Sequence, residues 1–116
     1  MLPTLYETFL VNCWEEREQI IPLRMTTLDA LQLLARENVS PDLIYIDAAH
    51  DFESVLEDVR TCRKMFPKAA LVGDDWAAEG VRRAVETVVK EEELEPMLGS
   101  NRTAWWLKTE CRYSQE

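Results

Sequence analysis

The chain has 116 residues, of which 47% are hydrophobic and 30% are charged, and 22 acidic against 13 basic residues give it a net charge of −9. This composition predicts a single folded domain, residues 1–116, and excludes a disordered chain. The negative charge excludes nucleic acid and anionic membranes as the main partners, because both require a basic face.

The N-terminal part of the sequence predicts a helix, a strand and a second helix. Apolar residues recur at helical spacing over residues 5–14. "QIIPLRM" (residues 19–25) predicts a short strand, and Pro22 favours a position at the edge of a sheet. "TTLDALQLLAREN" (residues 26–38) predicts a helix that one of its two leading threonines caps.

The remaining elements alternate between buried strands and amphipathic helices. "LIYID" (residues 43–47) and "AALVG" (residues 69–73) are short apolar runs of the kind found in parallel sheets. Apolar stripes predict helices over residues 52–66 and 77–93, the first with acidic residues in its first turn and basic residues in its last. Residues 94–108, with "GSNR" in the middle, predict an antiparallel hairpin.

This order of elements indicates an α/β fold. Strands that alternate with helices imply crossover connections, and therefore a mostly parallel sheet covered by helices on both faces. We accordingly expect a three-layer sandwich whose mostly parallel sheet ends in an antiparallel hairpin.

Three cysteines stand far apart without a CxxC pair, which argues against a disulfide framework or a zinc site. The first residues do not resemble a signal peptide, and no apolar run reaches the roughly 20 residues needed to span a bilayer. We expect a cytoplasmic protein.

Both apolar strands end in acidic residues. Asp47 follows the first strand, and Asp74 with Asp75 follows the second. Ligands of open parallel sheets bind beyond the carboxyl ends of the strands, so three carboxylates are expected at one rim. A divalent cation such as Mg²⁺ or Ca²⁺ would relieve their repulsion. His50, the single histidine of the chain, lies close enough in sequence to act there as a base.

Structural roles explain several of these residues equally well. Asp51, Asp74 and Asp75 stand near predicted helix starts, where aspartate is a common cap. A lone histidine at a helix start is more often solvated than catalytic. Trp76 is better explained by packing under the following helix than by a pocket.

The acidic motifs resemble a known family. "LIYIDAAHDFESVLEDVRTCRKMFPKAALVGDDWAAEGVRRAV" (residues 43–85) is similar to the second half of class I S-adenosylmethionine-dependent methyltransferases. The magnesium-dependent and sugar O-methyltransferases of that class have an "IDG-x-H" strand end and a "GG-x-L-x-x-DD" strand. The upstream "LYETFLVNCWEEREQIIPLRMTTLDAL" (residues 5–31) resembles the helix, strand and helix that come before.

This resemblance implies a function for each matched residue. Asp47, Asp74 and Asp75 match the family's metal ligands, and His50 matches the general base of some sugar O-methyltransferases. Asp47, Ala48 and His50 would lie at the cofactor. The implied reaction transfers a methyl group from S-adenosylmethionine to the hydroxyl of a small-molecule substrate, with Mg²⁺ or a similar cation.

The sequence departs from the family where the family binds its cofactor. The family builds that site mainly on the first strand, a glycine-rich turn and an acid after the second strand. This chain has no GxG, and its three glycines are Gly73, Gly80 and Gly99. Pro67 and Lys68 stand where the family has "GG". The sequence therefore resembles only the C-terminal half of a methyltransferase, a partial Rossmann-like fold.

Two functions follow from this departure. The chain is either a methyltransferase half that another chain or segment completes, or a non-catalytic assembly module that keeps the fold and a cation site. In both cases the strand over residues 43–47 would have an uncovered edge, an aggregation hazard. We therefore expect a homo-oligomer or a complementing chain.

Overall fold

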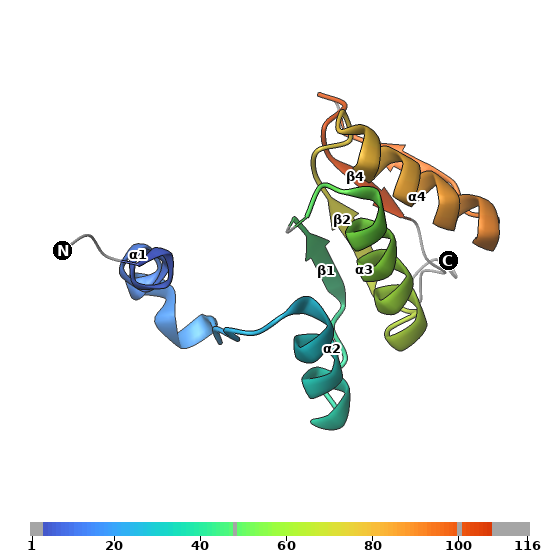
Figure 1. The fold of residues 1–116 in the computed structure, drawn as a ribbon. Helices are drawn as coiled ribbons and strands as arrows, with labels where there is room; N and C mark the ends of the chain where they lie inside the picture. The colour runs from blue at the N-terminus through green and yellow to red at the C-terminus, as the bar shows by residue number, and fades with distance from the viewer. Residues whose placement is uncertain (1–3, 48, 100, 108–116) are drawn as a thin grey trace, which may run out of the picture.

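The computed structural model describes residues 4–47, 49–99 and 101–107. The chain forms a mixed α/β fold in which a four-stranded open sheet packs against helices (Figure 1). The elements in chain order are α1 (Leu5–Asn12), the 3-10 helix η1 (Trp14–Gln19), α2 (Thr27–Arg36), β1 (Leu43–Ile46), α3 (Phe52–Met65), β2 (Ala70–Gly73), α4 (Glu79–Glu92), β3 (Pro96–Leu98) and β4 (Trp105–Leu107).

The strand order of the sheet is β1-β2-β4-β3. β1 and β2 are parallel, whereas β4 runs antiparallel to both β2 and β3. The predicted α/β class and the terminal hairpin are confirmed. The prediction of a mostly parallel sheet is wrong, because the hairpin contributes two antiparallel pairings and β4, not a further parallel strand, lies beside β2.

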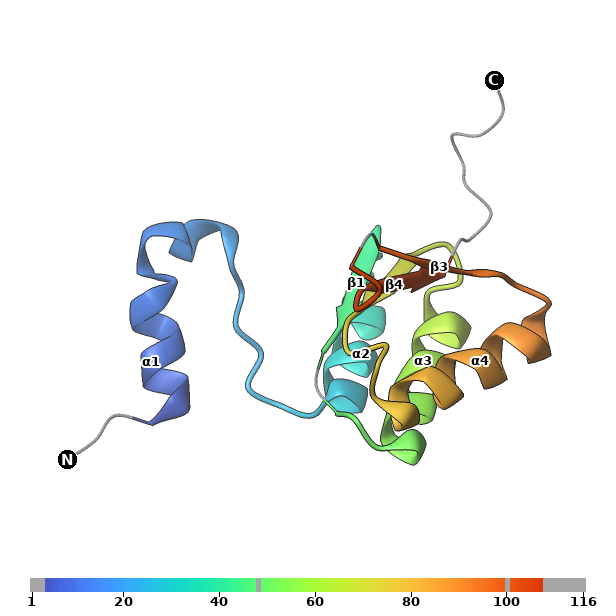
Figure 2. The ribbon, with the colours of Figure 1, turned by 90° about the horizontal axis from the view of Figure 1, so that it is seen from above.

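The helices α2, α3 and α4 lie on one side of the sheet (Figure 2). The described residues place no helix against the opposite side, so they form two layers of the expected three. Every described helix is too short or too polar to cross a membrane.

The N-terminal segment stands apart from the sheet (Figures 1 and 2). α1 forms as predicted, yet none of its residues is buried. The predicted strand over residues 19–25 is absent: Gln19 closes η1, and residues 20–25 form neither helix nor strand. A strand needs a neighbour for its hydrogen bonds, and this segment lies away from the β1 edge, with a proline at position 22 that has no N–H to donate.

The core lies between the sheet and the helices on its covered side. The apolar stripes predicted for α3 and α4 are confirmed, and Thr26 is the residue that caps α2, accepting a hydrogen bond from the Asp29 N–H at 3.2 Å. Adjacent residues of a strand face opposite sides of the sheet, so Trp105 is fully buried whereas Trp106 is half-buried. The fully or nearly fully buried residues of α3, α4, β2 and β4 are Val55, Val59, Cys62, Leu71, Val81, Ala84, Val85, Val88, Trp105 and Leu107.

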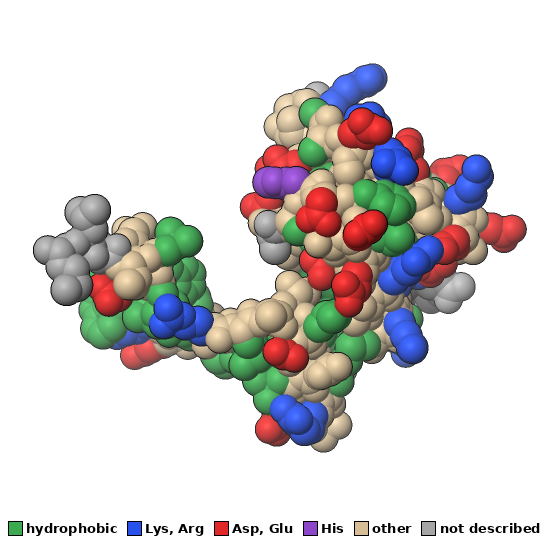
Figure 3. All heavy atoms as spheres, viewed as in Figure 1, with side chains coloured by type: hydrophobic (Ala, Val, Ile, Leu, Met, Phe, Trp, Pro, Cys, Tyr) green, Lys and Arg blue, Asp and Glu red, His purple; other side chains and the backbone are tan. Residues whose placement is uncertain are grey.

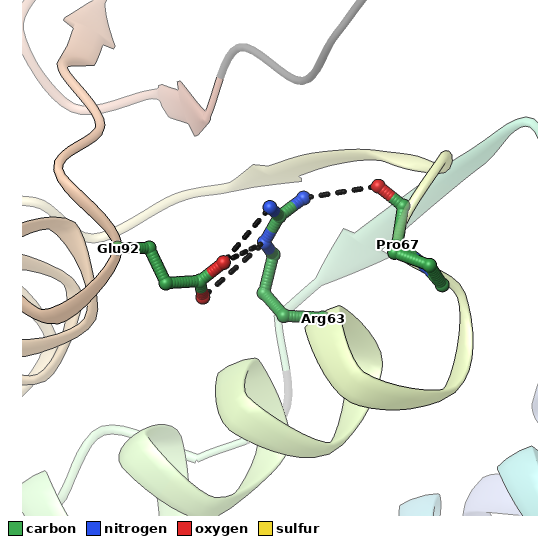
Figure 4. Close-up of polar contacts among 3 residues, drawn as sticks. All are labelled: Arg63, Pro67 and Glu92. Carbon is green, nitrogen blue, oxygen red and sulfur yellow. Dashed lines mark hydrogen bonds and ion pairs between the residues drawn. The ribbon is translucent and has the colours of Figure 1, made fainter.

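Two ion pairs tie α3 to α4. Arg63 makes the better shielded one: its Nη2 donates to Glu92 Oε1 at 2.9 Å and its Nη1 donates to the Pro67 carbonyl at 3.2 Å (Figure 4). Arg60 pairs with Glu91 further along the same helix interface. The Arg63 side chain is 13% exposed and the Arg60 side chain 50%, so water screens the second pair far more.

Replacing Arg63 with alanine is expected to lower the free energy of unfolding by about 2 kcal/mol, because it removes hydrogen bonds to the Glu92 carboxylate and to the Pro67 carbonyl just beyond α3. Urea unfolding followed by circular dichroism measures this. Arg60→Ala is the matched control, and we expect its unfolding midpoint to stay near that of the wild type. Equal effects of the two substitutions would contradict the assignment.

Candidate cation-binding site

The two parallel strands bring acidic residues to one rim of the sheet. β1 and β2 are in register, with Ile46 opposite Gly73. Asp47 directly follows β1 and Asp74 directly follows β2, so both residues lie at the same rim of the sheet. Parallel strands lie about 4.8 Å apart, so two positions 27 residues apart in the sequence come to the same rim of the sheet.

Two hydrogen bonds fix the backbone that follows β2. The indole Nε1 of the buried Trp105 donates to the Asp74 carbonyl at 3.0 Å, and the Trp76 N–H donates to the Thr103 carbonyl at 3.0 Å. Between these anchors Asp75 adopts the left-handed conformation, with φ 63°, which aspartate tolerates better than most residues. This turn directs the Asp75 side chain toward the loop that follows β1.

That loop carries His50 and meets the start of α4. An added Cβ at Gly80 would collide with the His50 carbonyl oxygen and would lie 2.9 Å from the Phe52 N–H nitrogen. The glycine therefore allows α4 to touch the loop. Asp51 caps α3 by accepting a hydrogen bond from the Ser54 N–H at 3.0 Å. Hydrogen bonding to the Ser54 side chain, and next to the Ser54 backbone, lowers the pKa of the Asp51 carboxyl. The cap is fully formed at neutral pH and is lost as the pH falls through that lowered pKa.

The side chains of Asp47, His50 and Asp75 converge. One ligand atom from each lies within 4.8 Å of the others. His50 Nε2 and Asp75 Oδ2 are 2.8 Å apart, and these side chains are 62% and 41% exposed. Figure 3 shows the histidine (purple) at the surface beside acidic side chains (red).

The structure thus brings together three of the residues expected at the rim. Asp74, expected as a metal ligand, is not part of this group. Ala48 lies outside the described residues. The capping interpretation holds for Asp51 and fails for Asp75, because α4 begins behind Ala78 without a side-chain cap. Trp76 packs against the core, as predicted.

Tyr45 and Gly80 belong to the site, although the sequence did not single them out. Desolvation raises the pKa of the Tyr45 hydroxyl, and the negative charges of Asp74, Asp47 and Asp75 raise it further. The negative charges of all three carboxylates therefore act on the Tyr45 hydroxyl at the rim of the sheet. Strand alternation places Tyr45 away from the core, and this was the signal that could have found it. No sequence pattern marks Gly80, whose role depends on a loop 30 positions away.

The donor set fits a divalent cation. Ligands of one ion that bind at about 2.1–2.3 Å stand roughly 3 Å apart when adjacent and about 4.5 Å apart when opposite, so a small inward rotation would close this group around an ion. Two carboxylates and open solvent positions suit Mg²⁺ or Mn²⁺, and an imidazole ligand would shift the preference toward Mn²⁺ or Zn²⁺.

Comparison with family models, curated proteins and solved structures gives no match for this chain.

Proposed function

We propose that this chain is the acceptor-side half of a cation-dependent O-methyltransferase, with its site at the rim formed by Asp47, His50 and Asp75. One observation carries the proposal: these side chains converge beyond the carboxyl ends of two parallel strands, where open α/β sheets bind ligands. The motifs that resemble the methyltransferase family contribute all three residues. The parallel pair, followed by an antiparallel hairpin, is also compatible with the C-terminal part of that fold.

In this proposal the two aspartates hold a cation and His50 is the base. The carboxylates of Asp47 and Asp75 supply hard oxygen ligands, and a bound Mg²⁺ would lower the pKa of a substrate hydroxyl. A carboxylate can only accept a hydrogen bond, so in this proposal His50 Nε2 is the donor to Asp75 Oδ2. The lone pair of the neutral ring then lies on Nδ1, which is the atom that takes the hydroxyl proton.

The residues of this chain do not fit a binding site for the methyl donor, S-adenosylmethionine. The sequence has no GxG turn, and the glycines at positions 73 and 80 are occupied by close contacts with Trp105 and the His50 loop. A backbone approach to S-adenosylmethionine would have to come from another chain or segment.

The test begins with titration calorimetry of the chain with Mg²⁺ and Mn²⁺. We expect binding in the range of about 0.1–1 mM, which is typical of open sites with few protein ligands. Asp75→Asn and Asp47→Asn should each weaken it at least about 10-fold, because each removes one charged ligand. Glu86→Gln removes the same charge from an exposed position on α4 and should leave binding unchanged.

Two further measurements separate the parts of the proposal. His50→Gln should leave Mg²⁺ affinity nearly unchanged if His50 is a base, whereas a large loss would make it a ligand. We expect no micromolar binding of S-adenosylmethionine by the chain alone. Tight binding would show that the donor side is present here and would overturn the division into halves.

A non-catalytic assembly module is the second candidate, and one observation favours it. Large apolar surfaces on the N-terminal segment and on the uncovered face of the sheet remain exposed to solvent. A chain that binds a cation but shows no methyl transfer with any complementing half would have this function.

A further inference from the structure

The described N-terminal residues 4–25 form an arm that stands away from the sheet (Figures 1 and 2). Its apolar side chains face solvent: Leu5 is 89% exposed and Trp14 is 60% exposed. Hydrophobic atoms accordingly cover much of its visible surface in Figure 3. Isolated helices shorter than about 12–15 residues are marginal in water, and α1 has eight residues, so it requires a surface to pack on.

The arm has a defined shape of its own. The guanidinium of Arg24 lies 4.6 Å from the centre of the Tyr6 ring, which holds the returning segment beside α1. Between α1, η1 and this segment is an apolar cavity of about 90 Å³, whose lining includes Phe9, Leu10 and Pro22. The arm therefore presents an apolar cavity to the surface on which it packs.

The uncovered side of the sheet is the matching surface. Strand register aligns Tyr45, Val72, Trp106 and Met97 in one row across all four strands. Burial alternates along β2 and β4, and the deeply buried residues of these strands belong to the opposite face. Leu43 is 57% exposed and Tyr45 is 54% exposed. This open sheet face, defined by Leu43 and the four residues of the row, is a continuous apolar surface.

We propose that the arm of one copy packs on the open sheet face of a second copy, and that the second copy returns its own arm to the first. Aromatic side chains bury roughly 150–250 Å² each, so two such contacts reach the roughly 1,200–2,000 Å² of a standard specific interface. The interface is closed and symmetric, as in most homodimers, and Tyr45 lies both on it and beside the cation site.

The connection between arm and body favours a second copy over the chain's own sheet. Arg24 is held against α1, and Thr26 is already the N-cap of α2, so Met25 alone is the hinge. α2 lies on the covered side of the sheet (Figure 2). The arm would have to pass around the β1 edge to reach its own open sheet face, whereas a partner's face is open to it directly.

The test measures mass in solution by light scattering and sedimentation, with reductant present. We expect the wild-type chain to dimerise in a concentration-dependent way. An arm variant, Leu10→Gln with Trp14→Gln, and a face variant, Tyr45→Thr with Met97→Thr, should each raise the dimer dissociation constant at least about 100-fold. All four substitutions are neutral and replace exposed side chains, so folding should be retained. Val39→Thr, at an exposed position outside both surfaces, is the control.

Mixing the two variants is decisive. The arm variant keeps an intact face and the face variant keeps an intact arm, so the mixture should form heterodimers through one intact contact while each variant alone stays monomeric. Three results would overturn the proposal: a folded wild-type monomer at high concentration, a dimer that survives both variants, or variants that do not complement each other. A dimer that survives both would point to pairing through the β1 edge.

Discussion

Replacing Gly73 with alanine is expected to lower the free energy of unfolding by about 3 kcal/mol, although alanine is normally preferred to glycine inside a strand. The Trp105 indole packs directly on Gly73, and an added Cβ would overlap its ring, with Nε1 only 2.7 Å away. The ring cannot move aside cheaply, because it is fully buried and its Nε1 donates to the Asp74 carbonyl. Urea unfolding provides the measurement.

A matched control and a double mutant isolate this contact. Gly99→Ala meets Ala104 Cβ at an ordinary 3.4 Å, so its stability should stay within about 0.5 kcal/mol of the wild type. Adding Trp105→Leu to Gly73→Ala should cost less than the sum of the single effects, because the smaller side chain removes the overlap. Purely additive effects would refute the packing explanation.

Replacing Gly80 with alanine is the second substitution for which we expect a large effect on stability. Whether the free energy of unfolding rises or falls shows which of two effects dominates, helix propensity or the contact with the His50 loop. Helix propensity alone predicts a gain of about 1 kcal/mol for this change in α4. We expect a loss of about 2 kcal/mol, because the new Cβ meets backbone atoms of His50 and Phe52 that no rotamer change can move. The displaced loop should also separate His50 from Asp75.

The lone histidine makes that separation measurable. Its ring gives a single set of imidazole signals in a ¹⁵N-resolved NMR spectrum. In Gly80→Ala these signals should move toward their positions in Asp75→Asn, whereas Mg²⁺ affinity should stay near the wild-type value, as in His50→Gln, because the two aspartates are the proposed ligands. Unchanged signals together with higher stability would show that α4 does not constrain the loop.

Local patterns predicted much of the body of the fold. Spacing of apolar residues located α3 and α4 and the faces that they bury, since a helical stripe depends only on its own sequence. The same patterns failed for residues 19–25, where a β-like run has no neighbouring strand to pair with. They also missed that β4 would lie beside β2, although Pro96 at the start of β3 favours an edge position for that strand.

The sequence by itself determined that acidic residues end both parallel strands and that His50 follows one of them. Only the tertiary structure decided which of these side chains meet. Asp75, not Asp74, reaches His50, because the left-handed turn at Asp75 and the Trp105 hydrogen bond orient that backbone. Side-chain direction at a rim depends on contacts between segments 25 to 31 positions apart, and such contacts exist only after the core has packed.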